Sequence, residues 1–455
     1  MDKTQLGQLV AAVKGEFSGG APGIEITGVC TDSRVVKPGD VFFALVAERD
    51  GHEFVEEAIR GGAAAVVVSS AVKADVPVVM VPDTLVALGD FAREYRAVHS
   101  IPVVAVTGSV GKTTTKEMIA AVLAGKYNVL KNDMNFNNEI GLPLTLFGLD
   151  QSHTAAVLEM AMRGPGEIRR LADIARPRIG VITNVGMSHI ELLESRDAIA
   201  TAKSELLDEL PTDGLAVINA DDDYCEFMKA RRYGRTVLFG MGEAADIRAT
   251  TLKVGRDGTP SATVTTVRGT VDLHLSAVGA HNMDNAMAAL AVGLEMGVTL
   301  EDAKSALEKV CSPSMRCEVT QSQAGYTVID DAYNANPASM SSAIRTLVAM
   351  DGRMKIAVLG DMLELGEYAR DAHVALAKQV AEENLDRLVT VGSLGRVIAE
   401  AAVDAGMDYD RVMTCDTSSE VAAELKPELG AGDIVLVKGS RGMKMEIVVE
   451  GLLRE

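Results

Sequence analysis

Short apolar runs separated by amphipathic segments predict an α/β protein built in three parts. The runs at 103–106, 155–158 and 179–183 are rich in Val, Ile, Ala or Leu, as expected for strands buried on both faces. Segments with helical spacing separate these and later runs. Over residues 99–313 this alternation predicts a central domain with a mostly parallel sheet.

The last part, residues 314–455, alternates most regularly. Its strands are expected at 326–329, 355–359, 387–391, 411–414 and 433–437, and its helices at 338–349, 369–384, 394–405 and 418–427. This order predicts a Rossmann-like doubly wound domain. Because no G-x-G-x-x-G sequence follows its strands, a dinucleotide is not expected there.

Residues 1–98 have a shorter and more mixed period. Residues 24–29 alternate like a strand, and apolar runs at 41–46, 64–68 and 78–81 are bounded by Gly, Ser and Pro. The pattern predicts a small mixed α/β domain. Its polar turn clusters, such as Asp32-Ser33-Arg34, either bind a ligand or only form turns.

Composition narrows the function classes. Acidic residues outnumber basic ones 64 to 44, and the resulting net charge of −20 argues against binding to nucleic acid or to an anionic membrane surface. The five cysteines form no C-x-x-C pair, which fits a reducing compartment. No secretory signal pattern opens the chain, and no apolar run approaches the ~20 residues that span a bilayer. We therefore expect a soluble cytoplasmic protein.

A loop with two glycines joins the strand at 103–106 to an amphipathic helix. Gly108 and Gly111 allow backbone N–H groups to converge on an anion at the helix N-terminus. Lys112 supplies a cation for phosphates, and the Thr113 hydroxyl is placed to ligate magnesium. The strict G-x-x-x-x-G-K-[ST] pattern is not met, because Val106 occupies the first glycine position. Strand, loop and helix nevertheless predict a phosphate-binding loop that consists of Thr107, Gly108, Ser109, Val110, Gly111, Lys112, Thr113 and Thr114.

Other polar residues follow strands of the central domain, where ligands of parallel sheets bind. Glu159 at one strand end is suited to holding Mg²⁺. His189 follows another strand, and by itself it is also explained as a structural residue. Asn282 and Asn285 share one helix face, where they either contact a base or ribose or cap the helix. The asparagine-rich segment 132–138 is typical of a loop, although amides also contact phosphates.

Together these motifs resemble the Mur ligases, the ATP-dependent amide-forming enzymes of peptidoglycan precursor synthesis. The resemblance covers nearly the whole chain. Its carriers are the phosphate-binding loop, segments 137–143, 183–186, 203–205, 281–285, 333–337, 360–366 and 438–441, and the single residues Glu159, His189, Arg316 and Asp331. The chain departs from the family pattern at Ala161 and Glu194, where glycine is common.

The resemblance implies ATP as a substrate, two magnesium ions and a carbamylated lysine. Thr113, Glu159, His189 and Lys203 would serve the metal, and Lys112, Lys203 and His189 would be catalytic. Without the resemblance, the helical segment around Lys203 would predict a solvated surface lysine. The implied nucleotide site consists of the phosphate-binding loop with Asn138, Asn282, Asn285, Arg316 and Asp331.

Within the family, the groups at 333–337, 360–366 and 438–441 indicate the member that adds D-alanyl-D-alanine to a UDP-N-acetylmuramoyl-tripeptide. The first domain is implied to bind the UDP substrate through Ser33 and Arg34. The last domain is implied to bind the dipeptide through Tyr333, Asn334, Asn336, Lys438, Ser440 and Arg441. We expect a monomer in the cytoplasm, whereas the sequence leaves open whether the chain self-associates, how far the domains rotate and which residue is third in the tripeptide.

Three alternatives remain at this point. A ligase that forms the tripeptide would add lysine or another diamino acid, but the chain has no D-N-P-R motif to read it. A folylpolyglutamate synthetase shares the fold and the ATP chemistry, and the Asp32-Ser33-Arg34 domain argues against it. A P-loop switch ATPase would need neither Lys203 nor the dipeptide loops, and ATP hydrolysis that depends on a UDP-peptide and an amine would exclude it.

Overall fold

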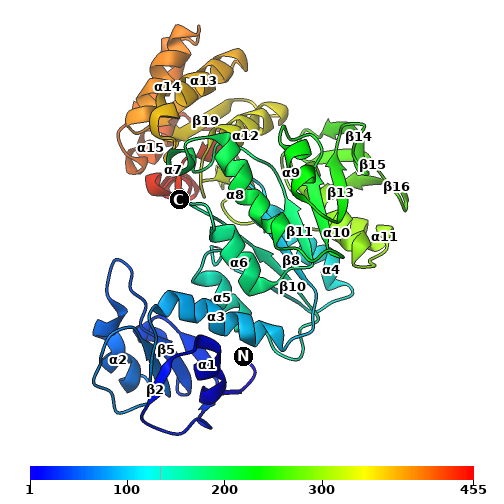
Figure 1. Ribbon diagram of the computed structural model, residues 1–455. Helices are drawn as coiled ribbons and strands as arrows, with labels where there is room; N and C mark the ends of the chain where they lie inside the picture. The colour runs from blue at the N-terminus through cyan, green and yellow to red at the C-terminus, as the bar shows by residue number, and fades with distance from the viewer. Residues whose placement is uncertain (134, 455) are drawn as a thin grey trace.

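The computed structural model describes residues 1–133 and 135–454. It places three units side by side, each built around one main sheet (Figure 1). We call them the N-terminal, central and C-terminal units. The mixed α/β fold class with mostly parallel sheets is confirmed.

The N-terminal unit contains a five-stranded sheet in the order β2-β7-β6-β5-β4, in which only β2 runs antiparallel to its neighbour. The single strand expected at 24–29 is two short strands in different sheets, because β3 pairs with β1 and β4 pairs with β5. The elements are β1 (Thr4–Gln5), α1 (Leu6–Val13), β2 (Glu16–Ser18), β3 (Glu25–Ile26), β4 (Gly28–Cys30), β5 (Asp40–Phe43), α2 (Val55–Arg60), β6 (Ala65–Val68), β7 (Val78–Met80) and α3 (Thr84–Ala97).

The central unit has a nine-stranded sheet in the order β16-β15-β14-β13-β12-β11-β8-β10-β9. The strands from β9 to β14 are parallel, as expected, whereas β15 and β16 extend the edge as an antiparallel hairpin that the sequence pattern did not predict. Its strands are β8 (Val103–Thr107), β9 (Val129–Lys131), β10 (Ala155–Glu159), β11 (Ile179–Ile182), β12 (Leu215–Asn219), β13 (Arg235–Gly240), β14 (Ile247–Val254), β15 (Pro260–Thr266) and β16 (Gly269–His274).

Helices cover both faces of this sheet (Figure 1). The apolar residues of α4 and α10 share one buried cluster with the sheet, and those of α6 and α8 belong to another. The helices are α4 (Lys112–Ala124), α5 (Gly141–Leu146), α6 (Glu167–Ala175), α7 (Ile190–Leu193), α8 (Arg196–Asp208), α9 (Cys225–Arg231), α10 (Asn282–Glu295) and α11 (Leu300–Leu307).

The C-terminal unit has a six-stranded sheet in the order β17-β18-β22-β19-β20-β21, of which only β17 is antiparallel. The expected strands and helices are present within two or three residues of their expected bounds. They are β17 (Glu318–Gln321), β18 (Thr327–Asp331), α12 (Pro337–Ala349), β19 (Lys355–Gly360), α13 (Ala369–Glu382), β20 (Arg387–Val391), α14 (Ser393–Asp404), β21 (Val412–Cys415), α15 (Ser418–Leu425), β22 (Ile434–Lys438) and α16 (Glu446–Leu453).

The carboxyl ends of β8, β10 and β11 in the central unit face loops that follow β18, β19 and β22 in the C-terminal unit, because all of these loops line one cavity. Every helix within residues 1–133 and 135–454 is too short or too polar to cross a membrane.

Candidate functional site

A cavity of about 770 Å³ lies where the central and C-terminal units meet. It is lined by the phosphate-binding loop, by the segments after β10 and β11, and by the C-terminal loops that carry Tyr333, Glu364 and Arg441. The geometry therefore brings together residues that lie up to 357 positions apart in the sequence, from Leu85 to Gly442.

The backbone of the phosphate-binding loop requires its two glycines. Gly108 has φ +152°, and a Cβ atom there would lie 1.9 Å from Thr183 Oγ1. Gly111 has φ +85°, and a Cβ atom there would lie 2.5 Å from Asn285 Oδ1. The α4 helix begins directly afterwards at Lys112, so its free N–H groups point toward the loop.

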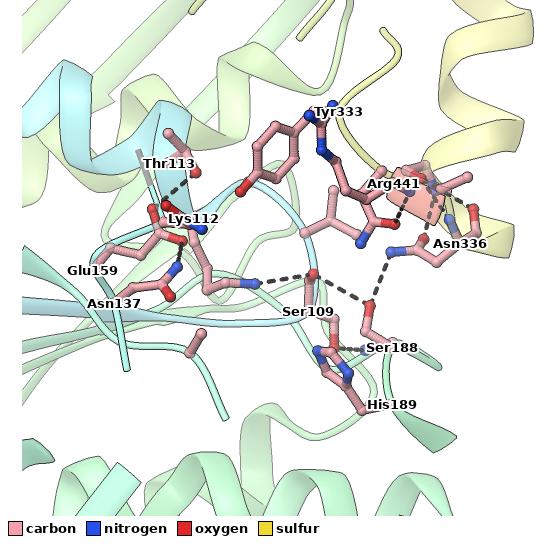
Figure 2. Close-up of a pocket in the computed structure, with 18 of the residues that line it drawn as sticks. Ser109, Lys112, Thr113, Asn137, Glu159, Ser188, His189, Tyr333, Asn336 and Arg441 are labelled. Carbon is pink, nitrogen blue, oxygen red and sulfur yellow. Dashed lines mark hydrogen bonds between the residues drawn. The ribbon is translucent and has the colours of Figure 1, made fainter. Parts of the chain in front are cut away.

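Lys112 folds back over this loop. Its Nζ donates to Gly108 O at 2.9 Å. It also donates to Ser109 O at 3.4 Å (Figure 2). Burial lowers the pKa of Lys112, and the Glu159 carboxylate opposes that effect. Because both acceptors are main-chain carbonyls and not carboxylates, the ammonium can turn toward a bound polyphosphate without breaking an ion pair.

The segment after β11 braces the phosphate-binding loop from the side. Asn184 Oδ1 accepts from Val110 N at 3.0 Å, and Asn184 Nδ2 donates to Val110 O at 3.0 Å. Ser188 Oγ donates to Ser109 O at 3.3 Å. These bonds hold the loop in place and use the N–H groups of Ser109 and Val110, so the N–H groups at the start of α4 are the ones left for an anion.

Oxygen ligands suited to a hard cation lie next to the loop. Thr113 Oγ1 donates to Glu159 Oε2 at 2.8 Å, and Asn137 Nδ2 donates to Glu159 Oε1 at 2.8 Å (Figure 2). A hydroxyl and a carboxylate beside a phosphate-binding loop are the donor set that Mg²⁺ prefers when phosphates supply further oxygens. Among the described residues, no three His, Cys, Asp or Glu side chains converge into a site made of such ligands alone.

Lys203 lies on α8 and is only 2% exposed, so the solvated surface position suggested by its helical surroundings is wrong. Burial and the nearby Lys112 charge lower its pKa well below the usual range. Within residues 1–133 and 135–454, its amine has neither a hydrogen bond nor an ion pair. A neutral, unpaired amine is the form that reacts with CO₂.

His189 reaches across to the C-terminal unit. Its Nδ1 lies 2.8 Å from Glu364 Oε2. Burial lowers the pKa of His189, the lysines at 112 and 203 lower it further, and Glu364 opposes the shift. His189, Lys112 and Lys203 are thus close enough for their charges to interact.

The two helix amides bond mainly to each other and to their surroundings. Asn285 Nδ2 donates to Asn282 Oδ1 at 2.9 Å, and Asn285 Oδ1 accepts from Thr115 Oγ1 at 3.0 Å. Asn282 Nδ2 donates to Val278 O at 2.7 Å. Both residues line the cavity, whereas Asn138 uses its carbonyl oxygen to accept from Ile140 N and Gly141 N at the start of α5.

The C-terminal wall carries a buried ion pair, with Lys438 Nζ 2.6 Å from Asp331 Oδ2. Lys438 also donates to Asn334 O at 2.9 Å. The Arg316 guanidinium lies over the Tyr333 ring, 4.2 Å from its centroid. These contacts hold the loop after β18 against the end of β22.

More exposed polar groups border the same wall. Arg441 Nη1 lies 3.1 Å from Glu446 Oε1, and the Arg441 side chain is 57% exposed. Ser440 Oγ accepts from Leu363 N at 2.8 Å, and Asn336 caps the N-terminus of α12. Arg441 is therefore the cation of this wall that a ligand can reach.

Most of the expected site residues line this one cavity, and five do not. Thr107, Gly108 and Lys203 lie behind its surface. Ser33 and Arg34 lie in the N-terminal unit, where Arg34 forms two bonds to the Asp32 carboxylate at 2.8 and 2.6 Å, and Ser33 Oγ donates to Glu57 Oε2 at 2.5 Å. The Arg34 guanidinium lowers the pKa of Asp32 to about 2.

Sequence reasoning did not select Ser188, Glu364, Glu139 or Arg163, all of which line the cavity. Ser188 sits next to His189 in a segment after a strand, and Glu364 sits in the loop at 360–366, so position after a strand was the available signal. Glu139 lies in the motif at 137–143 but was given no role there, and Arg163 lies outside every motif, so only the fold places them in the cavity.

Comparison with known proteins places these residues in one family. The chain matches the models described as Mur ligase family, catalytic domain (residues 25–96), Mur ligase middle domain (106–293) and Mur ligase, glutamate ligase domain (315–441). It is 39% identical to the UDP-N-acetylmuramoyl-tripeptide--D-alanyl-D-alanine ligase of Bacillus subtilis, over 94% of this chain and 93% of that protein.

Two solved structures are similar over nearly the full chain. The structure of UDP-N-acetylmuramoylalanyl-D-glutamyl-2,6-diaminopimelate--D-alanyl-D-alanyl ligase from Acinetobacter baumannii has a TM-score of 0.90 and 31% identity, and covers 100% of this chain and 99% of that chain. The MurF ligase of Thermotoga maritima in complex with ADP has a TM-score of 0.84 and 30% identity, with 93% and 96% coverage.

Proposed function

The chain belongs to the Mur ligase family, and we propose that it is the ATP-dependent ligase that joins D-alanyl-D-alanine to a UDP-N-acetylmuramoyl-tripeptide in peptidoglycan precursor synthesis. The observation that carries this proposal is the shared cavity. It combines a phosphate-binding loop and a magnesium-type donor pair on one wall with the exposed cation Arg441, which pairs with Glu446, on the other.

The reaction requires activation of a carboxylate. A carboxylate oxygen of the tripeptide attacks the γ-phosphorus of ATP, and ADP leaves, so that an acyl phosphate forms. The dipeptide nitrogen then attacks the acyl carbon, a tetrahedral intermediate collapses to the amide, and phosphate and a proton leave. Two anions must approach each other in the first step, so neutralisation and alignment supply most of the rate enhancement.

Lys112 and the loop N–H groups would hold the ATP phosphates beside the carboxylate. The ammonium would exchange the carbonyls of Gly108 and Ser109 for phosphate oxygens. Asn282 and Asn285 would border the adenine, whereas Arg316 and Asp331 would meet the phosphate and ribose from the C-terminal side. ATP would thus bind across the two units, and both must be in place before transfer.

The donor set fits magnesium, with Thr113 and Glu159 as protein ligands. Bound magnesium would neutralise charge on the transferring phosphoryl group. Lys203 fits carbamylation, because its buried amine is unpaired among the described residues and its pKa is lowered. Carbamylation would replace a positive charge with oxygen ligands, and together with His189 it would complete a second magnesium position.

The substrates would enter from opposite sides. Ser33 and Arg34 would bind the UDP portion on the N-terminal unit, with Arg34 exchanging its contact to Asp32 for a phosphate. Arg441 would pair with the dipeptide carboxylate, beside Tyr333, Asn334, Asn336, Lys438 and Ser440. Because ATP and a UDP-linked precursor are the substrates, we place the reaction in the cytoplasm.

ADP release over a panel of UDP-peptides and amines tests this function. Release should require both a UDP-tripeptide and D-alanyl-D-alanine, and Lys112→Ala should abolish it without loss of folding stability. Lys253→Ala, which removes an exposed lysine on β14, is the matched control and should keep the wild-type rate. ADP release without any UDP-peptide would instead favour a switch ATPase.

Lys203→Ala tests the carbamate. The variant should bind ATP and lose most activity, and formate or acetate should restore part of it by filling the vacated position. Lys203→Arg should be inactive and should not be rescued, because its guanidinium keeps a fixed positive charge there. An alanine variant with full activity in CO₂-depleted buffer would exclude the role.

A further inference from the structure

One end of the cavity carries charged side chains that the proposed chemistry does not use. Glu139 precedes α5, Arg163 lies in the loop between β10 and α6, and Glu167 is the first residue of α6. All three line the cavity together with the apolar side chains of Leu85 and Met162. This end therefore offers charges of both signs beside an apolar surface.

Two of these charges have no partner within residues 1–133 and 135–454. Glu139 is half-buried, and its carboxylate accepts no hydrogen bond and forms no ion pair there. Burial raises its pKa and the neighbouring Glu167 adds to that effect, whereas the charge of Arg170 opposes it. The Arg163 guanidinium is likewise unpaired, and only its backbone N–H donates to Glu167 Oε2, at 2.8 Å. An unpaired carboxylate and an unpaired guanidinium at one cavity end are available to a ligand.

The cavity end that carries Glu139 and Arg163 lies between the N-terminal unit and the phosphate-binding loop, and this position indicates which part of the substrate would reach it. Leu85 on α3 is the residue that the N-terminal unit contributes to the cavity lining. A precursor held at Arg34 and activated at Lys112 must pass that side. Arg163 lies four residues after Glu159, which bonds to Thr113 beside the phosphates. The side chain of the last peptide residue, whose carboxylate is activated, would therefore lie along the loop that carries Arg163.

We propose that Arg163 and Glu139 select a third peptide residue whose side chain ends in both a carboxylate and an ammonium group, as in 2,6-diaminopimelate. This inference rests on the proposed function and adds the substrate class to it. Arg163 would form a two-pronged contact with the distal carboxylate, and Glu139, with Glu167 behind it, would accept from the distal ammonium. Lysine offers only the ammonium, so it would leave Arg163 unpaired.

The test compares two UDP-tripeptides, one ending in 2,6-diaminopimelate and one in lysine, with D-alanyl-D-alanine as the amine. The wild type should show a kcat/KM at least about tenfold higher for the diaminopimelate substrate, the size expected of one charge-assisted contact. Arg163→Ala should reduce that ratio to near one, mainly through KM, with the KM for ATP unchanged. Glu139→Gln should raise the KM for both substrates, because both carry the ammonium.

Arg169→Ala is the matched control, since this arginine of α6 lies outside the cavity lining and contacts Asp208 and Glu209. It should leave the ratio at the wild-type value. A wild type that prefers lysine, or an Arg163→Ala variant that keeps the ratio, overturns the inference while the ligase function stands. A wild type that releases no ADP with either tripeptide overturns the proposed function and the inference with it.

Discussion

The central unit is joined to its two neighbours by very different contacts. On one side, α3 packs against α5 and α6 through aromatic rings, in contacts we call the N-terminal seam. The ring centroids of Phe91 and Phe147 are 5.0 Å apart, and those of Tyr95 and Phe147 are 5.6 Å apart. All three side chains are buried, so opening this seam would expose a large apolar area.

Buried polar bonds complete the N-terminal seam. Arg96 donates to Ala175 O, His99 O and Ile101 O at 2.7 to 3.0 Å, which leaves its guanidinium well satisfied. Arg93 bonds to Asp173 at 3.0 Å across the same contact. Separation of the units would break these hydrogen bonds and the ion pair, in addition to exposing the rings.

The C-terminal seam, around the cavity, is rich in polar contacts, although buried apolar residues of both units also share one cluster. Asn336 Nδ2 donates to Ser188 Oγ at 2.9 Å, His189 lies against Glu364, and Tyr368 OH donates to Glu194 O at 3.5 Å. His189, Glu194 and Glu364 all have φ near +63°, a left-handed conformation that favours glycine. Glu194 therefore carries backbone strain that a glycine at this position would not.

The difference assigns each seam a task. Polar contacts exchange for water at little net cost, about 0.5–1.5 kcal/mol for each hydrogen bond, whereas a buried aromatic seam does not. The N-terminal seam therefore fixes the distance between the proposed UDP site on the N-terminal unit and the cavity, which the precursor must span. The C-terminal seam would therefore be the easier of the two to open and close around ATP, if the units hinge around their ligands as other proteins do.

Removing a ring from the N-terminal seam should have the largest effect on stability. Phe91→Ala should lower the free energy of unfolding by about 3–5 kcal/mol, because the variant loses buried area and leaves a cavity. Urea denaturation followed by circular dichroism measures the change. Phe227→Ala, at a partly exposed ring on α9, should change it by less than about 1.5 kcal/mol. Equal losses in the two variants would contradict the rigid seam.

A change in the C-terminal seam should instead affect turnover. Figure 2 shows a chain of hydrogen bonds from Lys112 to Ser109 O, from Ser188 to that same oxygen, and from Asn336 to Ser188. Ser188→Ala breaks the chain between the phosphate-binding loop and the C-terminal unit. We expect kcat to fall about tenfold, which is ~1.4 kcal/mol, while stability changes by less than about 1 kcal/mol.

A double-mutant cycle distinguishes this linkage from two separate defects. Asn336→Ala alone should reduce kcat, and Ser188→Ala should then add little, because both substitutions break the same chain. Steady-state ADP release is measured in the wild type, the two single variants and the double variant. The deviation of the double variant from the sum of the single effects gives the coupling free energy between Ser188 and Asn336. Fully additive losses would show that Ser188 and Asn336 act independently.

The parts that were predictable from the sequence are those set by local pattern. The phosphate-binding loop follows from a strand, two glycines and a helix within about twenty residues, and the parallel strands follow from their apolar runs. The β15–β16 hairpin was missed because its residues alternate with many threonines and lack a continuous apolar run. Burial of Lys203 was missed by pattern alone, since the packing of α8 depends on elements distant in the chain.

Site contacts between units were beyond the reach of pattern. Glu364 lies 175 positions from His189, and no spacing rule relates the two. The pairing of Lys438 with Asp331 likewise depends on β18 and β22 being neighbours in the sheet. Tertiary pairing decides these contacts, so the fold must be known before the cavity can be described.

The smallest effect should come from His373, which supports the C-terminal seam from behind. Its buried Nε2 accepts from Met362 N at 2.9 Å, and its Nδ1 donates to Ala369 O at 2.6 Å, which holds the loop that carries Glu364. Burial lowers the pKa of His373, so the folded protein keeps the ring neutral. In the unfolded chain this histidine has a pKa of about 6.5. Below that pH the unfolded chain binds a proton that the folded chain does not, so the free energy of unfolding decreases as the pH is lowered.

His373→Gln keeps an acceptor for Met362 N without a titrating group. From pH 7.5 to 5.5 the wild type should lose more stability than this variant, by at most about 1.4 kcal/mol per pH unit. Urea denaturation at several pH values measures both slopes, and other histidines cancel in the difference. His274→Gln, at an exposed position on β16, is the control and should keep the wild-type slope. If His373→Gln also kept that slope, protonation of this buried ring would not be what weakens the protein in acid.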